Sequence, residues 1–173
     1  MAHRHSHNGS SRHRDDLTGE HRWGDAGQLA LALMFIAVWI TDSFILNYTT
    51  FLNQYIPLYI RTPLGIIFLF VSGYLARAGL KTVFRDEEKE PGVIREGVFG
   101  IMRHPIYLGE VLLYIGFLFL SLSLAAAVVW LVATGFLFYI SRFEEKLLLK
   151  RFGKAYEEYM NDVPMWIPRL CKR

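Results

Sequence analysis

Hydrophobic residues along the chain fall into four long runs separated by polar or charged segments. The runs cover residues 26–48, 62–80, 105–121 and 124–143. The first run, for example, is long enough as a helix to cross a hydrocarbon core of about 30 Å. The pattern therefore predicts an all-α fold, a polytopic membrane helical bundle with about four transmembrane helices.

The third and fourth runs are predicted to form a helical hairpin. As one helix rising 1.5 Å per residue, residues 104–143 would extend about 60 Å, roughly twice the bilayer core. The chain must therefore fold back, most simply near the S-L-S-L sequence at 121–124. Two antiparallel helices of similar length would bring Arg103 and His104 close to Glu144 and Glu145.

The segments around the runs are polar and differ in character. Residues 1–25 lack apolar periodicity and are expected to be a disordered or surface-lying tail, which leaves 26–173 as a single domain. The aromatic and polar segment 47–61 suits an interfacial loop. The charged segment 81–103, punctuated by Gly and Pro, is long enough to be a functional loop rather than a simple connector.

An amphipathic helix is predicted to begin at Glu144 and to lie along the cytoplasmic interface. Its apolar stripe has helical spacing and consists of Leu148, Phe152, Tyr156 and Tyr159. A tail limited by prolines follows. In this tail Trp166 fits an interfacial anchor better than a substrate contact.

Composition supports a membrane protein and argues against other classes. Of the 173 residues, 53% are hydrophobic, and the net charge of +3 comes without a basic, aromatic-interleaved patch for nucleic acid. One cysteine excludes an intrachain disulfide and a cysteine-built metal site. Five of the six histidines lie in the tail, where they are expected to be solvated, so no metal site is predicted.

The distribution of basic residues predicts the orientation in the membrane. Of the 19 Lys and Arg residues, the four-helix arrangement puts only Arg61 on the side opposite both termini. Because positively charged loops stay in the cytoplasm, both termini and the 81–103 loop are expected there.

The polar groups expected at the mouth of the hairpin have two interpretations. An arginine, a histidine, a tyrosine and two carboxylates could bind a polar, zwitterionic ligand, because carboxylates accept from hydroxyls or ammonium groups and Arg and His donate to anions. Each group could equally be an ordinary interfacial anchor. Spacing by itself leaves both interpretations open.

At these residues the sequence resembles the isoprenylcysteine carboxyl methyltransferase and phospholipid methyltransferase superfamily. The elements R-H-P-x-Y-x-G, E-E-x-x-L and F-G-x-x-Y-x-x-Y occur in the order and spacing of that superfamily. The resemblance covers residues 91–168, which would form the cofactor-binding part, and residues 1–60 contribute little to it.

The resemblance implies an integral membrane enzyme that takes S-adenosylmethionine from the cytosol and methylates a lipidic or membrane-dissolved acceptor. The residues implied at the cofactor site are Val93, Ile94, Phe99, His104, Pro105, Ile106, Tyr107, Glu144 and Glu145. The superfamily commonly has Tyr where this chain has Phe99, so a hydroxyl contact there is lost.

Catalytic roles are hypotheses for Arg103, His104 and Arg142. Methyl transfer from a sulfonium gains most from orientation in a dry pocket. Arg103 or Arg142 would steer a neutral or anionic acceptor, whereas an amine would lose its proton to His104 or Glu110. Glu110 is not recognised as a superfamily feature, and its position near a helix start also fits the helix dipole.

The acceptor stays open among a prenylated cysteine carboxylate, a phospholipid amine and a small hydrophobic thiol or phenol. Two other functions are alternatives. One is a membrane reductase related to sterol reductases that uses NADPH, although this chain is short for that class. The other is a non-catalytic membrane binding protein on the same scaffold.

Overall fold

The computed structural model describes residues 22–86 and 92–167, and within these ranges it is all-helical. The helices are α2 (Arg22–Ile40), α3 (Leu58–Asp86), α4 (Pro105–Ser121), α5 (Leu124–Phe152) and α6 (Lys154–Asp162). Shorter turns are η1 (Thr41–Leu46), η2 (Phe51–Gln54) and η3 (Gly97–Gly100). The expectations for residues 1–21, including the histidine-rich tail, lie outside the described residues.

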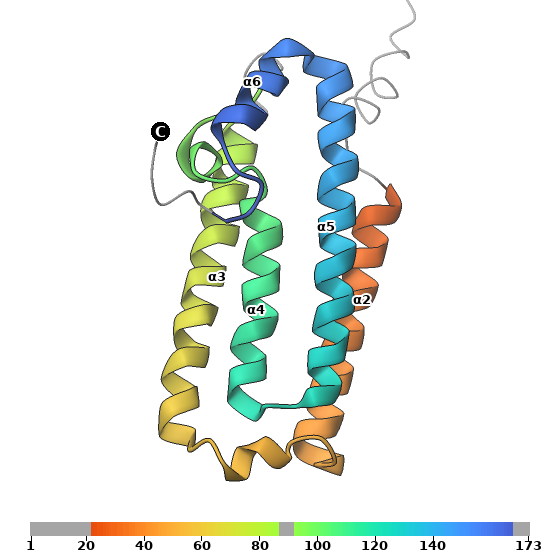
Figure 1. The fold of residues 1–173 in the computed structure, drawn as a ribbon, viewed down its shortest axis with the longest axis vertical. Coiled ribbons are helices and arrows are strands. Elements are labelled where there is room, and N and C mark those ends of the chain that lie inside the picture. The colour runs from red at the N-terminus through yellow and green to blue at the C-terminus, as the bar shows by residue number, and fades with distance from the viewer. Residues whose placement is uncertain (1–21, 87–91, 168–173) are drawn as a thin grey trace, which may run out of the picture.

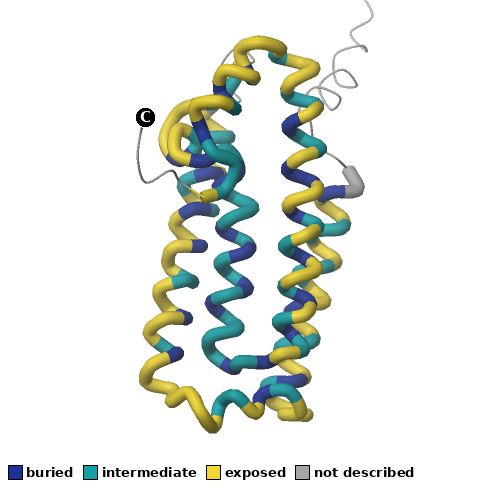
Figure 2. The backbone as a smooth tube through the Cα atoms, in the orientation of Figure 1, coloured by how far each residue is buried: buried dark blue, intermediate teal, exposed yellow. Residues whose placement is uncertain are grey.

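Helices α2 to α5 run alongside one another, and α6 crosses one end of the bundle (Figure 1). The closest packing is of α3 against α4 and of α2 against α5. Much of the outer surface consists of exposed apolar side chains (Figure 2), among them Phe70, Val128 and Leu131. Such a surface suits acyl chains rather than water.

Among the described residues, three helical segments are long and apolar enough to span a membrane, namely Gly24–Leu46, Leu58–Arg85 and Leu124–Phe152. The fourth apolar helix, α4, has 17 residues. At 1.5 Å per residue its length is about 26 Å, at the short end for a span. The membrane-helical fold is thus confirmed, whereas the count of four spans stays a prediction.

The predicted hairpin is present, and its turn lies where it was predicted, between the end of α4 at Ser121 and the start of α5 at Leu124. The chain reverses at Leu122, which has a φ of 49°, and the Ser123 side chain then accepts from the Ala126 backbone N–H as the N-cap of α5. The Ser123 hydroxyl donates to Asp42 at 2.5 Å. The turn is therefore fastened to η1 as well as to its own helix.

Several predicted helix boundaries were wrong. α2 starts at Arg22, inside the predicted tail, and α3 extends beyond the apolar run at both ends, to Leu58 and Asp86. The apolar run marks only the part of a helix within hydrocarbon, whereas backbone hydrogen bonding continues into polar sequence.

The predicted amphipathic helix beginning at Glu144 was also wrong. Helix α5 continues through Glu144 to Phe152, and the left-handed φ of 54° at Gly153 separates it from α6. The apolar stripe nevertheless packs as one cluster, because Leu148 and Phe152 of α5 contact the buried tyrosines Tyr156 and Tyr159.

Candidate functional site

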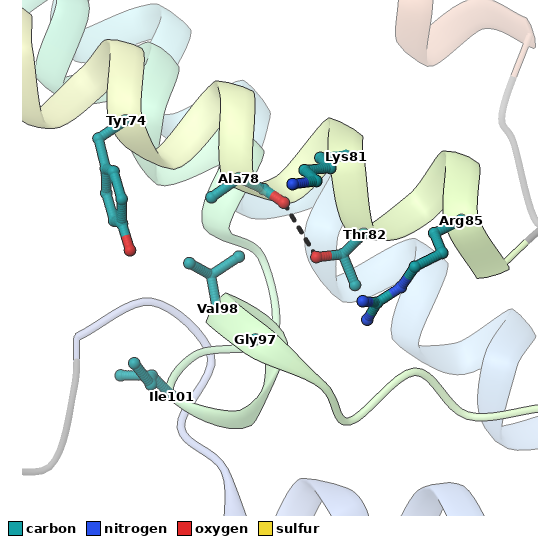
Figure 3. A pocket seen from close by; sticks show the side chains of 8 residues that line it. All are labelled: Tyr74, Ala78, Lys81, Thr82, Arg85, Gly97, Val98 and Ile101. Carbon is teal, nitrogen blue, oxygen red and sulfur yellow. Dashed lines mark hydrogen bonds between the residues drawn. The ribbon is translucent and has the colours of Figure 1, made fainter.

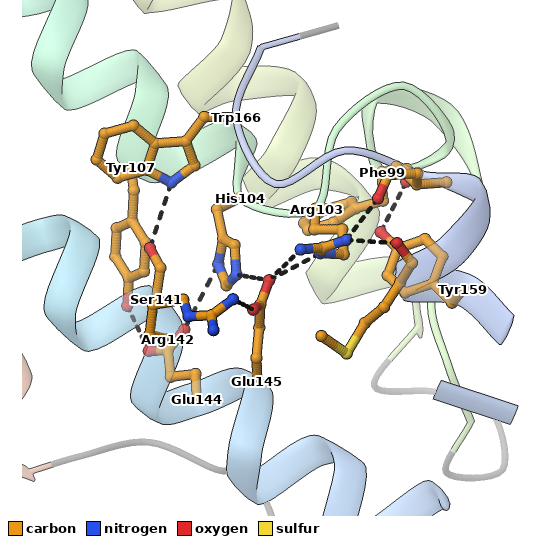
Figure 4. A network of polar contacts seen from close by, with 12 residues as sticks. Phe99, Arg103, His104, Tyr107, Ser141, Arg142, Glu144, Glu145, Tyr159 and Trp166 are labelled. Carbon is orange, nitrogen blue, oxygen red and sulfur yellow. Dashed lines mark hydrogen bonds and ion pairs between the residues drawn. The ribbon is translucent and has the colours of Figure 1, made fainter. Parts of the chain in front are cut away.

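The start of α4 and the last third of α5 bring the predicted polar residues together (Figure 4). We call this group the polar mouth, and its members are Arg103, His104, Tyr107, Arg142, Glu144 and Glu145. The hairpin positions them, because α4 begins at Pro105, where a helix needs no backbone donor, and α5 returns to the same end.

Glu144 lies beside the two aromatic members of the polar mouth. The Tyr107 hydroxyl donates to Glu144 Oε1, and His104 Nδ1 lies 3.7 Å from Glu144 Oε2. The His104 and Tyr107 rings stack with centroids 5.7 Å apart and an interplanar angle of 11°. These contacts fix the orientation of both rings toward α5.

Glu145 is buried and paired with Arg103. The Arg103 Nε and Nη2 atoms each lie 2.7 Å from Glu145 Oε1, and the two side chains are 8% and 3% exposed. On the same carboxylate, His104 Nε2 lies 3.4 Å from Oε1, and Nη1 of the exposed Arg142 lies 3.6 Å from Oε2. A buried charge of this kind is stable only with such compensation.

Arg103 also fastens the segment after α6, residues 163–167, which we call the C-terminal strap. The Arg103 Nη1 group donates to the carbonyls of Met160 and Val163, at 2.8 and 2.6 Å. The backbone N–H groups of Arg103 and His104 donate to the Met165 carbonyl at 3.2 and 3.1 Å. Its contacts make Arg103 a link between α4, α5 and the strap.

Trp166 contacts α5 beside the polar mouth, a position that sequence reasoning missed. Its indole Nε1 donates to Ser141 Oγ at 3.3 Å, and its ring meets Phe138 edge-on at 6.0 Å. Trp166 is half-buried rather than simply exposed at an interface. No sequence spacing links it to Ser141, because only the return of the strap brings the two together.

Pro105 and Ile106 point away from the polar mouth. A Cβ atom on Gly79 of α3 would lie 2.7 Å from Ile106 Cγ1 and 3.6 Å from Pro105 Cγ. Their side chains thus pack on α3, while His104 and Tyr107 face α5. Successive helical residues point about 100° apart, so one continuous motif serves two faces.

The predicted loop residues are divided between two other contacts. Val93 packs against the cluster of Tyr156 and Tyr159, whereas Phe99 packs beside Leu75. The Tyr159 hydroxyl donates to the Phe99 carbonyl at 2.7 Å, and burial raises the pKa of Tyr159, so the phenol stays a neutral donor.

Ile94 is half-buried in the same loop. At Phe99 this loop contacts α6 through its backbone, since the Phe99 carbonyl accepts from Tyr159.

Two buried atoms of the polar mouth have no hydrogen-bond partner among the described residues. They are His104 Nε2 and Glu145 Oε2. Their ion-pair neighbours at 3.4 and 3.6 Å are too far or too poorly aligned to satisfy them. Buried polar atoms are nearly always hydrogen-bonded, so these two have hydrogen-bonding capacity left for a ligand or a water molecule.

A surface pocket of about 270 Å³ lies elsewhere, between α3 and η3 (Figure 3). Its lining consists of Tyr74, Ala78, Lys81, Thr82, Arg85, Gly97, Val98 and Ile101. Its polar groups are largely engaged, since Thr82 donates to the Ala78 carbonyl and Arg85 pairs with Glu96. It contains no member of the polar mouth.

Within residues 22–86 and 92–167, no group of three or more His, Cys, Asp or Glu side chains is arranged to hold a metal ion. The polar mouth is instead a mixed set of cations, carboxylates and aromatic rings. Such a set suits an organic ligand that carries both charges.

Fold and site together define an all-helical membrane protein with a polar mouth at one end of a helical hairpin. The phospholipid methyltransferase family model matches residues 60–155, more than half of the chain, and the chain belongs to this family. The match begins well before residue 91, where the resemblance was expected to start.

Similar proteins carry methyltransferase names. The chain is 30% identical over 160 residues to methanethiol S-methyltransferase of Crocosphaera subtropica, covering 84% of this chain and 59% of the relative. It is 28% identical over 114 residues to protein-S-isoprenylcysteine O-methyltransferase A of Arabidopsis thaliana, covering 60% and 57%. The chain thus spans less than two thirds of the length of these curated relatives.

Proposed function

We propose that the protein is an integral membrane methyltransferase that uses S-adenosylmethionine and acts on a lipidic or membrane-dissolved acceptor. Membership of the phospholipid methyltransferase family and the names of the relatives support this activity. The apolar spans support a bilayer as its surroundings. We propose further that the polar mouth and both termini face the cytosol, where the cofactor is available.

The observation that carries the proposal is the pair of unsatisfied buried atoms, His104 Nε2 and Glu145 Oε2. A cofactor with an ammonium group, a carboxylate and ribose hydroxyls offers both donors and acceptors to such a site. Carboxylates accept from the ammonium and hydroxyl groups, while a histidine nitrogen is free to donate or accept. The residues present therefore fit the cofactor.

We assign cofactor binding to His104, Tyr107, Glu144 and Glu145. The cofactor supplies an electrophilic methyl group, and these residues hold and orient it. Val93, Ile94, Phe99, Pro105 and Ile106 stay predicted members of the site, acting through the loop and the α3–α4 contact. Orientation and exclusion of water are the main contributions that such a reaction needs.

The two arginines receive different roles in this proposal. The Arg103 guanidinium is occupied by Glu145 and by carbonyls of Met160 and Val163, so we assign it to positioning. Arg142 is exposed, with Glu145 as its ion-pair partner at 3.6 Å. Arg142 is therefore the better placed of the two to steer an acceptor.

The proposal is tested by titrating purified protein with S-adenosylhomocysteine in a calorimeter. Wild type is expected to bind in the micromolar range, and His104→Ala and Glu144→Ala are expected to lose binding, because each removes a member of the polar mouth assigned to the cofactor. Glu157→Gln, on the exposed face of α6, is the control and should bind normally.

Near-normal affinity in both site variants would contradict the proposed site. A parallel titration with NADPH addresses the reductase alternative, since binding of NADPH without S-adenosylhomocysteine would favour that class. Transfer of a labelled methyl group to membrane lipid extract, followed by mass analysis, then identifies the acceptor.

A further inference from the structure

The Glu110 side chain lies between α4 and α2, below the polar mouth. It follows Tyr107 by three residues and precedes Tyr114 by four, so these side chains share one face of α4. Glu110 is about 4.5 Å deeper along the helix than Tyr107. The polar face of the mouth thus continues inward from the end of the bundle.

Both Glu110 oxygens have partners from the surrounding helices. Gln28 of α2 donates its amide to Oε2, and the Tyr114 hydroxyl donates to Oε1. Tyr114 is 1% exposed and its ring lies 4.5 Å from that of Phe35. Glu110 is therefore the last carboxylate on this face of α4 before the apolar core around Phe35.

The contacts hold Glu110 in place but do not require a carboxylic acid. A glutamine at this position would accept from one partner and donate its amide N–H to the other, because the Gln28 amide oxygen and the Tyr114 hydroxyl can also accept, and it would avoid placing an acid in hydrocarbon. Ionisable residues inside a membrane are costly and generally mark a function. The choice of an acid points to a step in which a proton is accepted.

The surroundings of Glu110 also disfavour an anionic acceptor. Tyr107, one helical turn nearer the mouth, donates its hydroxyl to Glu144, so the carboxylates of Glu144 and Glu110 both border this face of α4. A carboxylate acceptor would meet their repulsion and has no proton to lose. A neutral thiol or amine meets neither difficulty.

We propose that Glu110 takes the proton of the methyl acceptor and that the acceptor group is a neutral thiol or amine rather than a carboxylate. This inference rests on the proposed function. In the step, an amine that arrives as ammonium first gives its proton to Glu110, whereas a thiol gives its proton as it reacts, and the lone pair of the acceptor forms the bond to the methyl carbon. The methyl–sulfonium bond breaks with its electron pair left on the cofactor sulfur, and the acceptor proton passes to the Glu110 carboxylate.

The activity test uses full-length protein in detergent with three probes of similar apolarity. These are decanethiol, decylamine and N-acetyl-S-farnesylcysteine, whose reacting group is a carboxylate. Wild type is expected to label the thiol or the amine and not the carboxylate. Glu110→Gln should lower kcat for that probe by about 100-fold or more, whereas its affinity for S-adenosylhomocysteine should stay within about twofold because the cofactor site is intact.

Two further variants separate a chemical role from a structural one. Glu110→Asp keeps an acid and should recover part of the lost rate, while Glu157→Gln makes the same change on the exposed face of α6 and should match wild type. Without cofactor, Glu110→Gln should also weaken decylamine binding relative to decanoate. Glu157→Gln has the same net charge as Glu110→Gln, so comparing the two variants corrects for partition of the charged probes into micelles.

Each outcome decides the inference. The inference is overturned if Glu110→Gln folds and keeps its rate within threefold. It is also overturned if the wild type labels only the carboxylate probe or none of the three probes. In either case, binding of S-adenosylhomocysteine by the wild type leaves the proposed function standing. If Glu110→Gln loses its thermal transition and Glu110→Asp folds but recovers none of the lost rate, Glu110 is assigned to packing and the inference is overturned. Absence of cofactor binding in wild type overturns both.

Discussion

Glu144 and Glu145 are neighbours in the chain but occupy different environments. Glu144 is half-buried beside His104 and Tyr107, whereas Glu145 is 2% exposed and faces Arg103. Adjacent helical positions point about 100° apart, so Glu144 faces the two aromatic rings, whereas Glu145 faces the arginine that links α4 to the strap. The two adjacent carboxylates therefore have different structural partners, and only Glu145 belongs to the buried ion pair with Arg103.

Arg103→Ala is expected to destabilise the protein by about 3–5 kcal/mol, because it leaves the Glu145 carboxylate buried without its partner. Thermal unfolding in detergent, followed by circular dichroism, measures the effect. Arg85→Ala removes an exposed pair with Glu96 and should cost at most about 1 kcal/mol.

The paired replacement Arg103→Met with Glu145→Leu should recover much of the stability, because no buried charge is then left unpaired. If Arg103→Ala unfolds at the wild-type temperature, Arg103 is not the structural link described above.

At the scale of elements, α3 and α4 pack closely through small residues. A Cβ atom on Gly65 would lie 2.9 Å from the Gly116 carbonyl oxygen, and one on Gly116 would lie 2.7 Å from Leu69 Cδ2. Helices in membranes approach closely where such small residues meet. This contact sets where Pro105 and Ile106 lie, and hence which face of α4 carries the site.

Gly65→Ala is expected to destabilise the bundle by about 1–3 kcal/mol, because the Gly116 backbone cannot easily move away. Gly73→Ala lies on the same helix with nothing within 4 Å of the added Cβ, and should be neutral or stabilising by up to about 1 kcal/mol. Thermal midpoints of the two variants in the same detergent give the comparison. Equal effects would show that helix propensity, not packing, governs α3.

At the scale of the whole molecule, the number of membrane crossings decides where the termini lie. Figure 1 shows the start of α2 and the end of α6 toward the same end of the bundle. Four crossings would put both termini on one side, whereas three long spans with α4 outside the membrane would put them on opposite sides.

Reporter fusions at each terminus in a bacterial host test this arrangement. We expect green fluorescent protein to fluoresce at both ends and alkaline phosphatase to be inactive at both, since the basic residues favour the cytoplasm. Opposite results at the two termini would mean an odd number of crossings and would remove α4 from the set of spans.

Much of the site was predictable because local sequence set its geometry. The apolar runs fixed the helical class, and the reversal that bilayer thickness demands near residue 122 placed Arg103 and His104 beside Glu144 and Glu145. Gly153 ends α5, yet the helical spacing of Tyr156 and Tyr159 predicted one apolar stripe, and the two residues do lie in one buried cluster. Periodicity and length are local properties, so a single sequence displays them.

Only the tertiary structure decided which residue contacts which partner across the bundle. The chain alone determined an all-helical membrane protein whose polar motifs meet at the end of a hairpin. It did not determine that Arg103 holds the strap, that Trp166 reaches Ser141, or that Gln28 meets Glu110 from α2. Those contacts depend on how helices rotate and pack against one another, and that choice is made by side-chain complementarity between segments far apart in sequence.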